Sequence, residues 1–279
     1  MRRGIVVAGM LLAMGLAGTA EAQDRYQSDV SFELLSVENT TGPMDVSLKT
    51  IGYRWYFAQV DGMEGPIELQ PFRQRASWAE IGIGFGEEEL GGTDVGGLNI
   101  GARYVIPNSP VGVDVSYESV EQNDADFYDY LRLGAVVWLN DDSNLAIEAG
   151  FTFGEVTFVP SDFTSLDVGA RYVMPIGDMA LEIAGRYRTI DPDAAGAPDN
   201  SGIEIETRYF FMDELFAGLS FSTVDADGQP DTSNWAISAG YSLPCGLDVG
   251  LRFGEGAAPW NAFPSGDDDV FALEVGFRF

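Results

Sequence analysis

The last nine residues of the chain, Phe271-Ala-Leu-Glu-Val-Gly-Phe-Arg-Phe279, decide the fold. In an extended strand, successive side chains point to opposite faces. One face of this segment therefore carries only Phe, Leu and Val side chains, and the other carries Ala, Glu, Gly and Arg. An apolar face backed by a polar one predicts a transmembrane β-strand, with lipid on one side and water on the other.

This ending resembles the closing strand of bacterial outer-membrane β-barrels, which stop on an aromatic residue. The resemblance implies an all-β transmembrane barrel in the bacterial outer membrane. It also implies that Phe277 and Phe279 belong to the membrane-insertion signal that the barrel-insertion machinery reads in that family. The expected partners are outer-membrane lipid and lipopolysaccharide, the insertion machinery, and small solutes or ions.

The opposite end of the chain has the pattern of a secretory signal peptide. Met1-Arg2-Arg3 precedes an apolar run over residues 5–16, and Ala20-Glu21-Ala22 supplies small residues around a cleavage site. The run is shorter than the roughly 18 apolar residues of a membrane-spanning helix. We therefore expect a signal peptide over 1–22 and a barrel over 23–279.

The charge and the residue types exclude some function classes. The chain has 15 basic and 44 acidic residues, a formal net charge of −29 at pH 7, and removal of 1–22 makes it more negative still. Nucleic acid is a poor partner for such a chain. Histidine is absent, which removes the commonest general base and metal ligand. We expect no enzyme activity, no metal site and no cofactor.

Cys245 is the single cysteine, so no intramolecular disulfide can form. Its simplest role is to fill a turn. The alternative is an exposed thiol that pairs with a partner protein.

Alternating side chains predict fourteen strands, although twelve or sixteen remain possible. Most reach the roughly nine to eleven residues that a tilted transmembrane strand needs. Short connectors at 107–110, 140–143, 175–178, 212–214 and 244–246 alternate with longer, mostly acidic ones. This is the arrangement of an antiparallel up-and-down barrel with short periplasmic turns, long outer loops and both termini in the periplasm. The expected strands are 28–38, 46–57, 74–86, 97–106, 111–120, 129–139, 144–155, 165–174, 179–190, 203–211, 215–224, 235–243, 247–254 and 270–279.

One connector does not follow this rule. Residues 59–72 fall at a periplasmic position yet are long, and they contain Pro66 and Pro71. A surface turn is the simplest interpretation. A folded-in turn, a plug or a partner contact are the alternatives.

The outward faces are apolar, as in Leu98, Ile100, Ala102, Tyr104 and Ile106, or Leu145, Ile147, Ala149, Phe151 and Phe153. An Arg turned to lipid costs about 2–4 kcal/mol at the bilayer midplane, which favours the register with Arg inside. Trp138 does not fit this scheme, because it has the same parity as Arg132 in one strand. Outward aromatic residues near the periplasmic ends would form a girdle: Trp55, Phe57, Tyr104, Tyr172, Tyr209, Phe211, Tyr241 and Phe279.

Charged residues on the inner face predict ion pairs in the lumen. The short turns place Arg103 opposite Asp114, Arg171 opposite Glu182, and Asp167 opposite Arg186. Five arginines near the periplasmic ends would form a ring, which either sets ion selectivity or is neutralised by neighbouring acids. The expected pore-lining residues are Arg54, Arg103, Asp114, Glu118, Arg132, Glu148, Asp167, Arg171, Glu182, Arg186, Arg208, Asp248, Glu274 and Arg278.

The whole chain expected after cleavage resembles a small porin. Tyr53-Arg-Trp-Tyr-Phe57, followed by Val60-Asp61, Gly65-Pro66 and Glu68, is similar to the second-strand region of porins from Gram-negative bacteria. The resemblance implies an outer-membrane channel for passive diffusion of small hydrophilic solutes or ions. The excess of acid favours cations at the outer mouth.

Two alternatives and two details remain at this stage. A structural or interaction barrel would have a closed lumen and acidic outer loops that bind a partner. An outer-membrane enzyme would need a base other than histidine. The acidic runs 87–89 and 267–269 are solvated loop tips, or they bridge to lipopolysaccharide phosphates through divalent cations. The solute and the number of associated barrels are left open.

Overall fold

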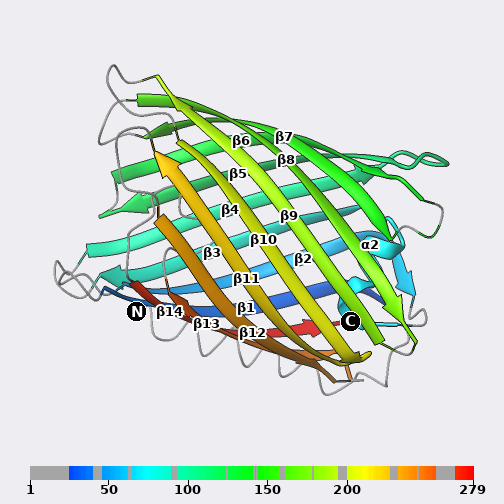
Figure 1. The fold of residues 1–279 in the computed structure, drawn as a ribbon. Coiled ribbons are helices and arrows are strands. Elements are labelled where there is room, and N and C mark those ends of the chain that lie inside the picture. The colour runs from blue at the N-terminus through cyan, green and yellow to red at the C-terminus, as the bar shows by residue number, and fades with distance from the viewer. Residues whose placement is uncertain are drawn as a thin grey trace.

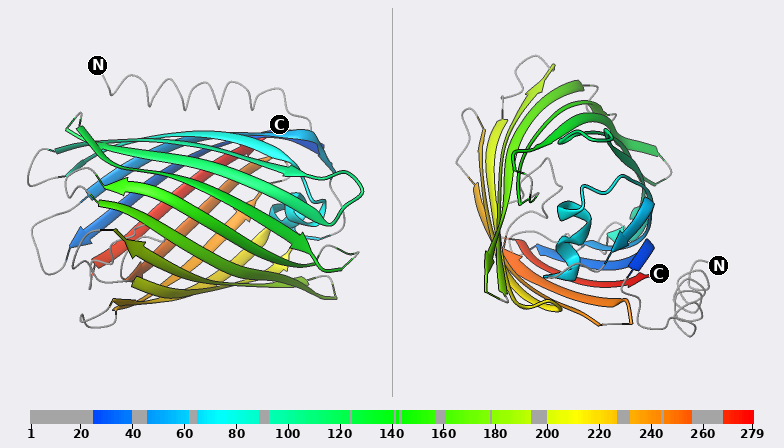
Figure 2. Two further views of the ribbon diagram at one scale, coloured as in Figure 1. Left: turned by 90° about the horizontal axis from the view of Figure 1, so that it is seen from above. Right: turned by 90° about the vertical axis from the view of Figure 1, so that its right-hand side faces the viewer.

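The computed structural model shows a closed antiparallel barrel in which neighbouring strands follow the order of the chain (Figures 1 and 2). It describes residues 25–39, 46–61, 65–88, 93–123, 125–140, 142, 144–156, 161–177, 179–193, 200–226, 232–243, 245–255 and 268–279. The expected signal peptide lies outside these residues, as do Glu89 and Asp267 of the acidic runs.

Fourteen strands are formed within the described ranges, which confirms the predicted number. Their bounds are β1 Arg25–Asn39, β2 Val46–Asp61, β3 Trp78–Glu88, β4 Thr93–Val105, β5 Val111–Gln122, β6 Ala125–Trp138, β7 Leu145–Val156, β8 Ser161–Ile176, β9 Met179–Pro192, β10 Asn200–Met212, β11 Leu215–Ala226, β12 Thr232–Ser242, β13 Leu247–Glu255 and β14 Asp268–Arg278. A 3-10 turn, η1 (Ile67–Leu69), and a short helix, α2 (Gln70–Arg73), lie between β2 and β3. In this part of the chain, no helix is long and apolar enough to cross a membrane.

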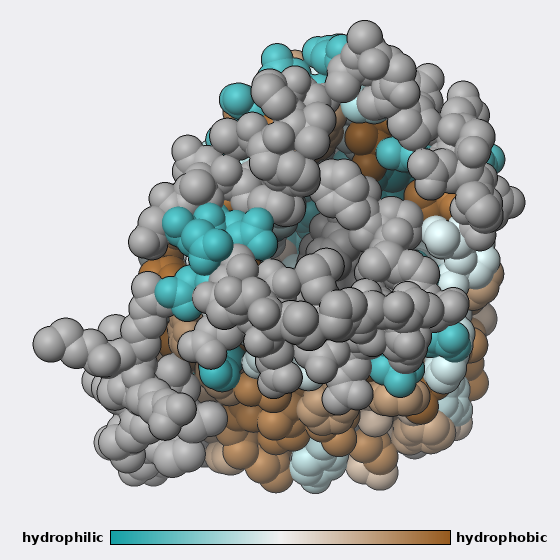
Figure 3. Space-filling model, turned by 90° about the vertical axis from the view of Figure 1, so that its left-hand side faces the viewer, coloured by the Kyte–Doolittle hydropathy of each residue, from teal (hydrophilic) through white to brown (hydrophobic). Residues whose placement is uncertain are grey.

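The outer surface of the barrel is apolar, as the alternation predicted. Ile100 and Ile147 are exposed, and so are Phe151 and Phe153, which pack edge to face. A view from one end of the barrel shows hydrophobic residues along its flank and hydrophilic residues near its rim (Figure 3). The aromatic residues expected in the girdle are exposed at six positions, Trp55, Phe57, Tyr104, Tyr172, Phe211 and Tyr241, and half-buried at Tyr209 and Phe279.

β1 and β14 close the barrel. Asp29 pairs with Arg278 in the ladder, and the pairing continues to Asn39 and Asp268. The last residue completes the seam, because Phe279 N donates to Ser28 O and Phe279 O accepts from the backbone of Ser28. Phe277 is buried and stacks on Phe279 with ring centroids 6.0 Å apart. The residues expected in the insertion signal therefore also seal the sheet.

The predicted register is confirmed in one hairpin and wrong in another. Arg103 lies opposite Asp114, as expected. Around the turn after β8, however, Arg171 lies opposite Ala184, and Asp167 lies opposite Arg188 rather than Arg186. The strand continues through Pro175 to Ile176, which pairs with Met179, so the turn is two residues shorter than the sequence suggested. The shift is even, so every side chain keeps its face.

The connector 59–72 is not a surface turn, and β3 begins at Trp78 instead of residue 74. Arg75 has a positive φ of 51°, so extended backbone resumes only after it. Seen along the barrel axis, η1 and α2 lie inside the ring of strands (Figure 2, right). The alternative of a folded-in turn or plug is the one that the structure supports, and we call residues 65–77 the plug.

We expect an Arg at Ile100 to destabilise the folded barrel by about 2–4 kcal/mol, because it places a charge in hydrocarbon near the middle of β4. The neighbouring variant Asn99→Arg is the matched control, because Asn99 faces the lumen cavity. Urea unfolding in phospholipid vesicles measures both. Equal losses in the two variants would contradict the assignment of faces.

Candidate functional site

The plug packs against one part of the inner wall. Leu69 is fully buried and Phe72 nearly so. They belong to one apolar cluster with residues from six consecutive strands, β6 to β11. The wall residues of this cluster are Val136, Trp138, Ala146, Val173, Ala180, Phe210 and Phe216. The wall is therefore apolar where the plug covers it, in a lumen that elsewhere carries charge.

Trp138 is the residue that the sequence pattern left unassigned, and the plug explains it. It is buried, and its ring lies 6.1 Å from that of Phe72. β6 pairs with β7 without a register shift, so Arg132 and Trp138 both face inward with no bulge between them. In the alternating pattern of β6, Trp138 falls on the same face as the inward Arg132. This position was the available signal that an apolar segment enters the barrel at this end.

Polar contacts fix the plug in place. Gln70 Nε2 donates to the carbonyls of Gly65 and Pro66, at 3.0 and 3.2 Å. Ile67 N donates to Asp213 O in the turn after β10, at 3.1 Å. Arg75 Nη2 donates to Asn140 O at 2.8 Å. The plug is thus joined to two of the short turns as well as to the apolar wall.

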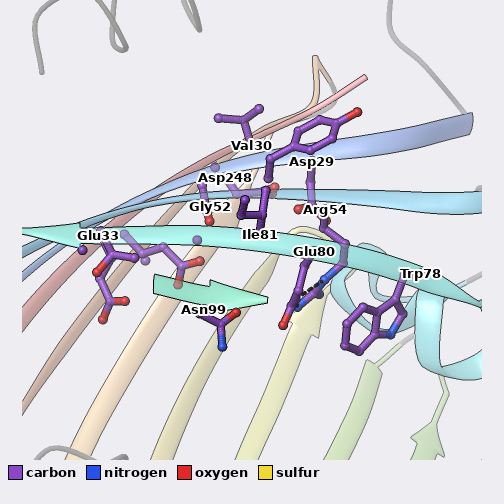
Figure 4. Close-up of a pocket in the computed structure, with 18 of the residues that line it drawn as sticks. Asp29, Val30, Glu33, Gly52, Arg54, Trp78, Glu80, Ile81, Asn99 and Asp248 are labelled. Carbon is purple, nitrogen blue, oxygen red and sulfur yellow. Dashed lines mark hydrogen bonds and ion pairs between the residues drawn. The ribbon is translucent and has the colours of Figure 1, made fainter. Parts of the chain in front are cut away.

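A cavity of about 1060 Å³ lies beside the plug within the barrel. The plug contributes Glu68, Pro71 and Phe72 to its lining. All five arginines of the predicted ring line it: Arg54, Arg103, Arg171, Arg208 and Arg278. Figure 4 shows one side of this cavity, where Arg54 points toward Glu80 next to Trp78.

Each arginine of the ring is neutralised by an acid, which was one of the two predicted possibilities. Their partners are Glu80 for Arg54, Asp114 and Glu148 for Arg103, Glu182 for Arg171, Glu182 and Glu68 for Arg208, and Asp248 for Arg278. Arg171 reaches Glu182 diagonally, despite the register shift. Each guanidinium also lies over an aromatic ring, such as Arg171 over Phe72 at 4.4 Å.

Arg132 links this ring to a second set of pairs. It donates to Asp167 at 2.9 Å and to Asp114 at 3.2 Å. Asp167 therefore pairs with Arg132 rather than with Arg186, which instead approaches Glu148 at 4.0 Å. The network differs from the predicted pairs because side chains reach across two strands.

Some acids on the lumen wall form no ion pair among the described residues. Glu118 accepts hydrogen bonds from Tyr128 and Tyr130, at 2.8 and 2.7 Å. Glu33 and Glu274 lie directly opposite each other on β1 and β14, and both line the cavity. Within the described residues, neither forms an ion pair, and no group of three or more acidic or Cys side chains could hold a metal ion.

Glu68 is the carboxylate that the plug places in the lumen. It accepts a hydrogen bond from Arg208 Nη1 at 3.1 Å and belongs to no membrane-spanning strand. Burial raises the pKa of Glu68 to about 7, because desolvation outweighs the attraction of Arg208 and Arg278. The carboxylates of Asp248 and Glu274 raise the pKa further.

The raised pKa makes the stability of the plugged barrel depend on pH. A carboxyl whose pKa is higher in the folded state stabilises that state below its ordinary pKa, and this advantage is lost as pH rises from about 4.5 to about 7. Relative to Glu68→Gln, we expect the wild type to lose up to about 3 kcal/mol between pH 4 and pH 8.

Urea unfolding in detergent across this pH range tests the prediction. The exposed turn variant Asp142→Asn controls for the general effect of removing one negative charge. If the unfolding free energies of the wild type and the Gln variant changed equally with pH, the assignment of Glu68 to a partly buried, desolvated position would be contradicted.

No protein-family model matches the chain, and a search of curated proteins found no match. Solved structures of outer-membrane proteins do match. Omp33 of Acinetobacter baumannii is 20% identical, with 92% of this chain and 99% of that chain covered and a TM-score of 0.62. OmpF of Salmonella typhi is 11% identical (92% and 98% covered, TM-score 0.52), and a bacterial polysaccharide outer membrane secretin is 10% identical (91% and 99% covered, TM-score 0.51). These likenesses show that the chain has the fold of bacterial outer-membrane β-barrels.

Proposed function

We propose that this protein is an outer-membrane channel through which small hydrophilic solutes or ions diffuse passively, with a preference for cations. The observation that carries the proposal is a cavity within the barrel that is lined by charged side chains and enclosed by an apolar outer surface. An exterior of this kind places the barrel in lipid, and a charged lumen offers water and ions a route that lipid does not. The fold that the chain shares with porins supports the same function.

Glycine lines the part of the cavity wall that β3 and β4 form. Gly82, Gly84 and Gly97 line the cavity on β3 and β4. A Cβ atom added at any of them would meet its nearest neighbour only at 3.6–3.7 Å, so packing does not require glycine there. Glycine weakens a strand interior. We infer that these positions are kept small because the lumen must stay wide along β3 and β4.

The balance of charge in the lumen favours cations. The ring arginines are neutralised within the wall, so they leave little free positive field. Glu33 and Glu274 face each other instead, an arrangement of like charges that destabilises a sheet. Unpaired acids on a pore wall attract cations and repel anions. We propose that these two residues contribute most of the preference.

The alternative function is a structural or interaction barrel with a closed lumen. Its support is the plug, together with the density of ion pairs around the cavity. In that case the acidic outer loops would bind a partner, and the lumen charges would only stabilise the wall. Conduction separates the two functions.

We expect the refolded chain 23–279 to give stable conductance steps in a planar bilayer, with a reversal potential across a salt gradient that indicates cation preference. Glu274→Gln should lower the cation-to-anion permeability ratio by about half or more, because it removes an unpaired charge from the cavity wall. Glu214→Gln in a periplasmic turn is the matched control and should leave the ratio unchanged. A folded barrel without any conductance, including after removal of the plug, would contradict the channel and favour the closed barrel.

A further inference from the structure

We propose that the plug is a displaceable gate: the seated plug is the closed state of the channel, and conduction begins when residues 65–77 leave the apolar wall. This inference rests on the proposed channel function. It assigns the regulation of the pore to one segment. The contacts within this segment can be distinguished from its contacts with the barrel.

Hydrogen bonds within the plug help to hold its shape. Its internal backbone bonds run from Leu69 N to Pro66 O, from Gln74 N to Gln70 O, and from Ala76 N to Pro71 O, whereas Ile67 N bonds to Asp213 of the barrel. The Gln70 side chain bonds to carbonyls at the start of the plug. Because these groups are satisfied within the plug, η1 and α2 can move together, and barrel contacts such as Ile67 N to Asp213 O are exchanged for water.

Both ends of the plug have hinge-like backbone. Gly65 has a φ of +105°, a conformation that side-chain-bearing residues rarely adopt, and Arg75 has a φ of 51°. Gln74 bonds through its side chain to the backbone of Asp61, which ties the far end of the plug to the end of β2. Rotation at these two points would swing η1 and α2 while the attachment to β2 and β3 remained.

The barrel wall does not need the plug for its charge balance. Glu182 forms ion pairs with both Arg171 and Arg208, and Arg208 also lies 3.8 Å from Glu206, so both arginines keep a partner on the wall when Phe72 and Glu68 move away. The plug adds one contact to each arginine, the ring of Phe72 to Arg171 and the carboxyl of Glu68 to Arg208. Two arrangements of the plug are therefore compatible with one arrangement of the wall.

The seated state also carries a cost. Trp138 is buried beneath the plug, and its Nε1 has no hydrogen-bond partner among the described residues. A buried N–H without a partner destabilises the state that buries it. Departure of the plug would let water reach this group. The apolar contacts of Leu69 and Phe72 oppose that gain, which makes the closed state favoured but reversible.

A reversible cross-link tests the gate. In a background with Cys245→Ser, cysteines at Ile67 and Asp213 would be joined, because Ile67 N bonds to Asp213 O at 3.1 Å. This pair avoids the apolar cluster and the lumen arginines. We expect oxidation to reduce the open probability at least tenfold and a reductant to restore it. Each single-cysteine variant under the same oxidation is the matched control.

Two further variants keep the outcomes distinct. Replacement of residues 66–75 by a Gly-Ser linker should hold the channel open, and Phe72→Ala should raise the open probability severalfold because it removes one of the two buried anchors. Heat-dependent migration on gels verifies that each variant is folded. If the oxidised, cross-linked protein conducted as well as the reduced protein, the proposed gate would be contradicted, whereas the proposed channel function would still hold.

The remaining outcomes also decide between the two proposals. If the linker variant conducted and the wild type never did, the plug would be a permanent seal and the gate would be wrong. If both were folded and silent, the channel itself would be refuted, and the gate with it.

Discussion

Lipid offers no hydrogen-bond partner to a peptide group, and this constraint determines the rest of the structure. A sheet in a membrane must therefore close on itself, because a free edge would leave a row of unsatisfied N–H and C=O groups in hydrocarbon. The ladder between β1 and β14 meets this requirement, and the backbone of Phe279 extends it to the last residue. Once the sheet is closed, each strand has one face in lipid and one in the lumen. Every charged side chain within the membrane must then face the lumen, where water or an opposite charge can stabilise it.

The ion pairs around the cavity follow from this confinement. Fourteen arginines and acids on adjacent inner faces were expected from alternation, and most of them form ion pairs in the structure, with Arg132 and Glu182 each joining residues of several strands. Long side chains reach diagonal neighbours as well as direct ones. This is why Arg171 still contacts Glu182 although its direct neighbour is Ala184. The lumen tolerates a shift of two residues in register, whereas a shift of one would turn charges into lipid.

The strands were predictable from the sequence because their cause is local. A period of two is visible in any ten residues, and it placed Ile100 and Ile147 outward and Arg103 opposite Asp114. The prediction for the turn after β8 was wrong because it assigned Pro175 to the turn, whereas Pro175 still pairs with Ala180. Pro107 lies beyond the end of β4, while Pro175 is accommodated within β8. The same five residues, Gly-Ala-Arg-Tyr-Val, stand before both prolines, so the local sequence does not contain the difference.

The inward position of the plug could not be predicted, because the residues that bury it are spread along the chain. Leu69 and Phe72 are buried by residues from six strands, the last of them Phe216. No local pattern distinguishes this segment from a surface turn. The wall residues, taken together, do carry a signal: Trp138, Phe210 and Phe216 are large apolar side chains on the inner faces of strands that should be polar there. An apolar patch in an aqueous lumen is unfavourable unless something covers it. The inner face of the barrel therefore requires an occupant at this end, and the chain supplies one from its own longest periplasmic connector.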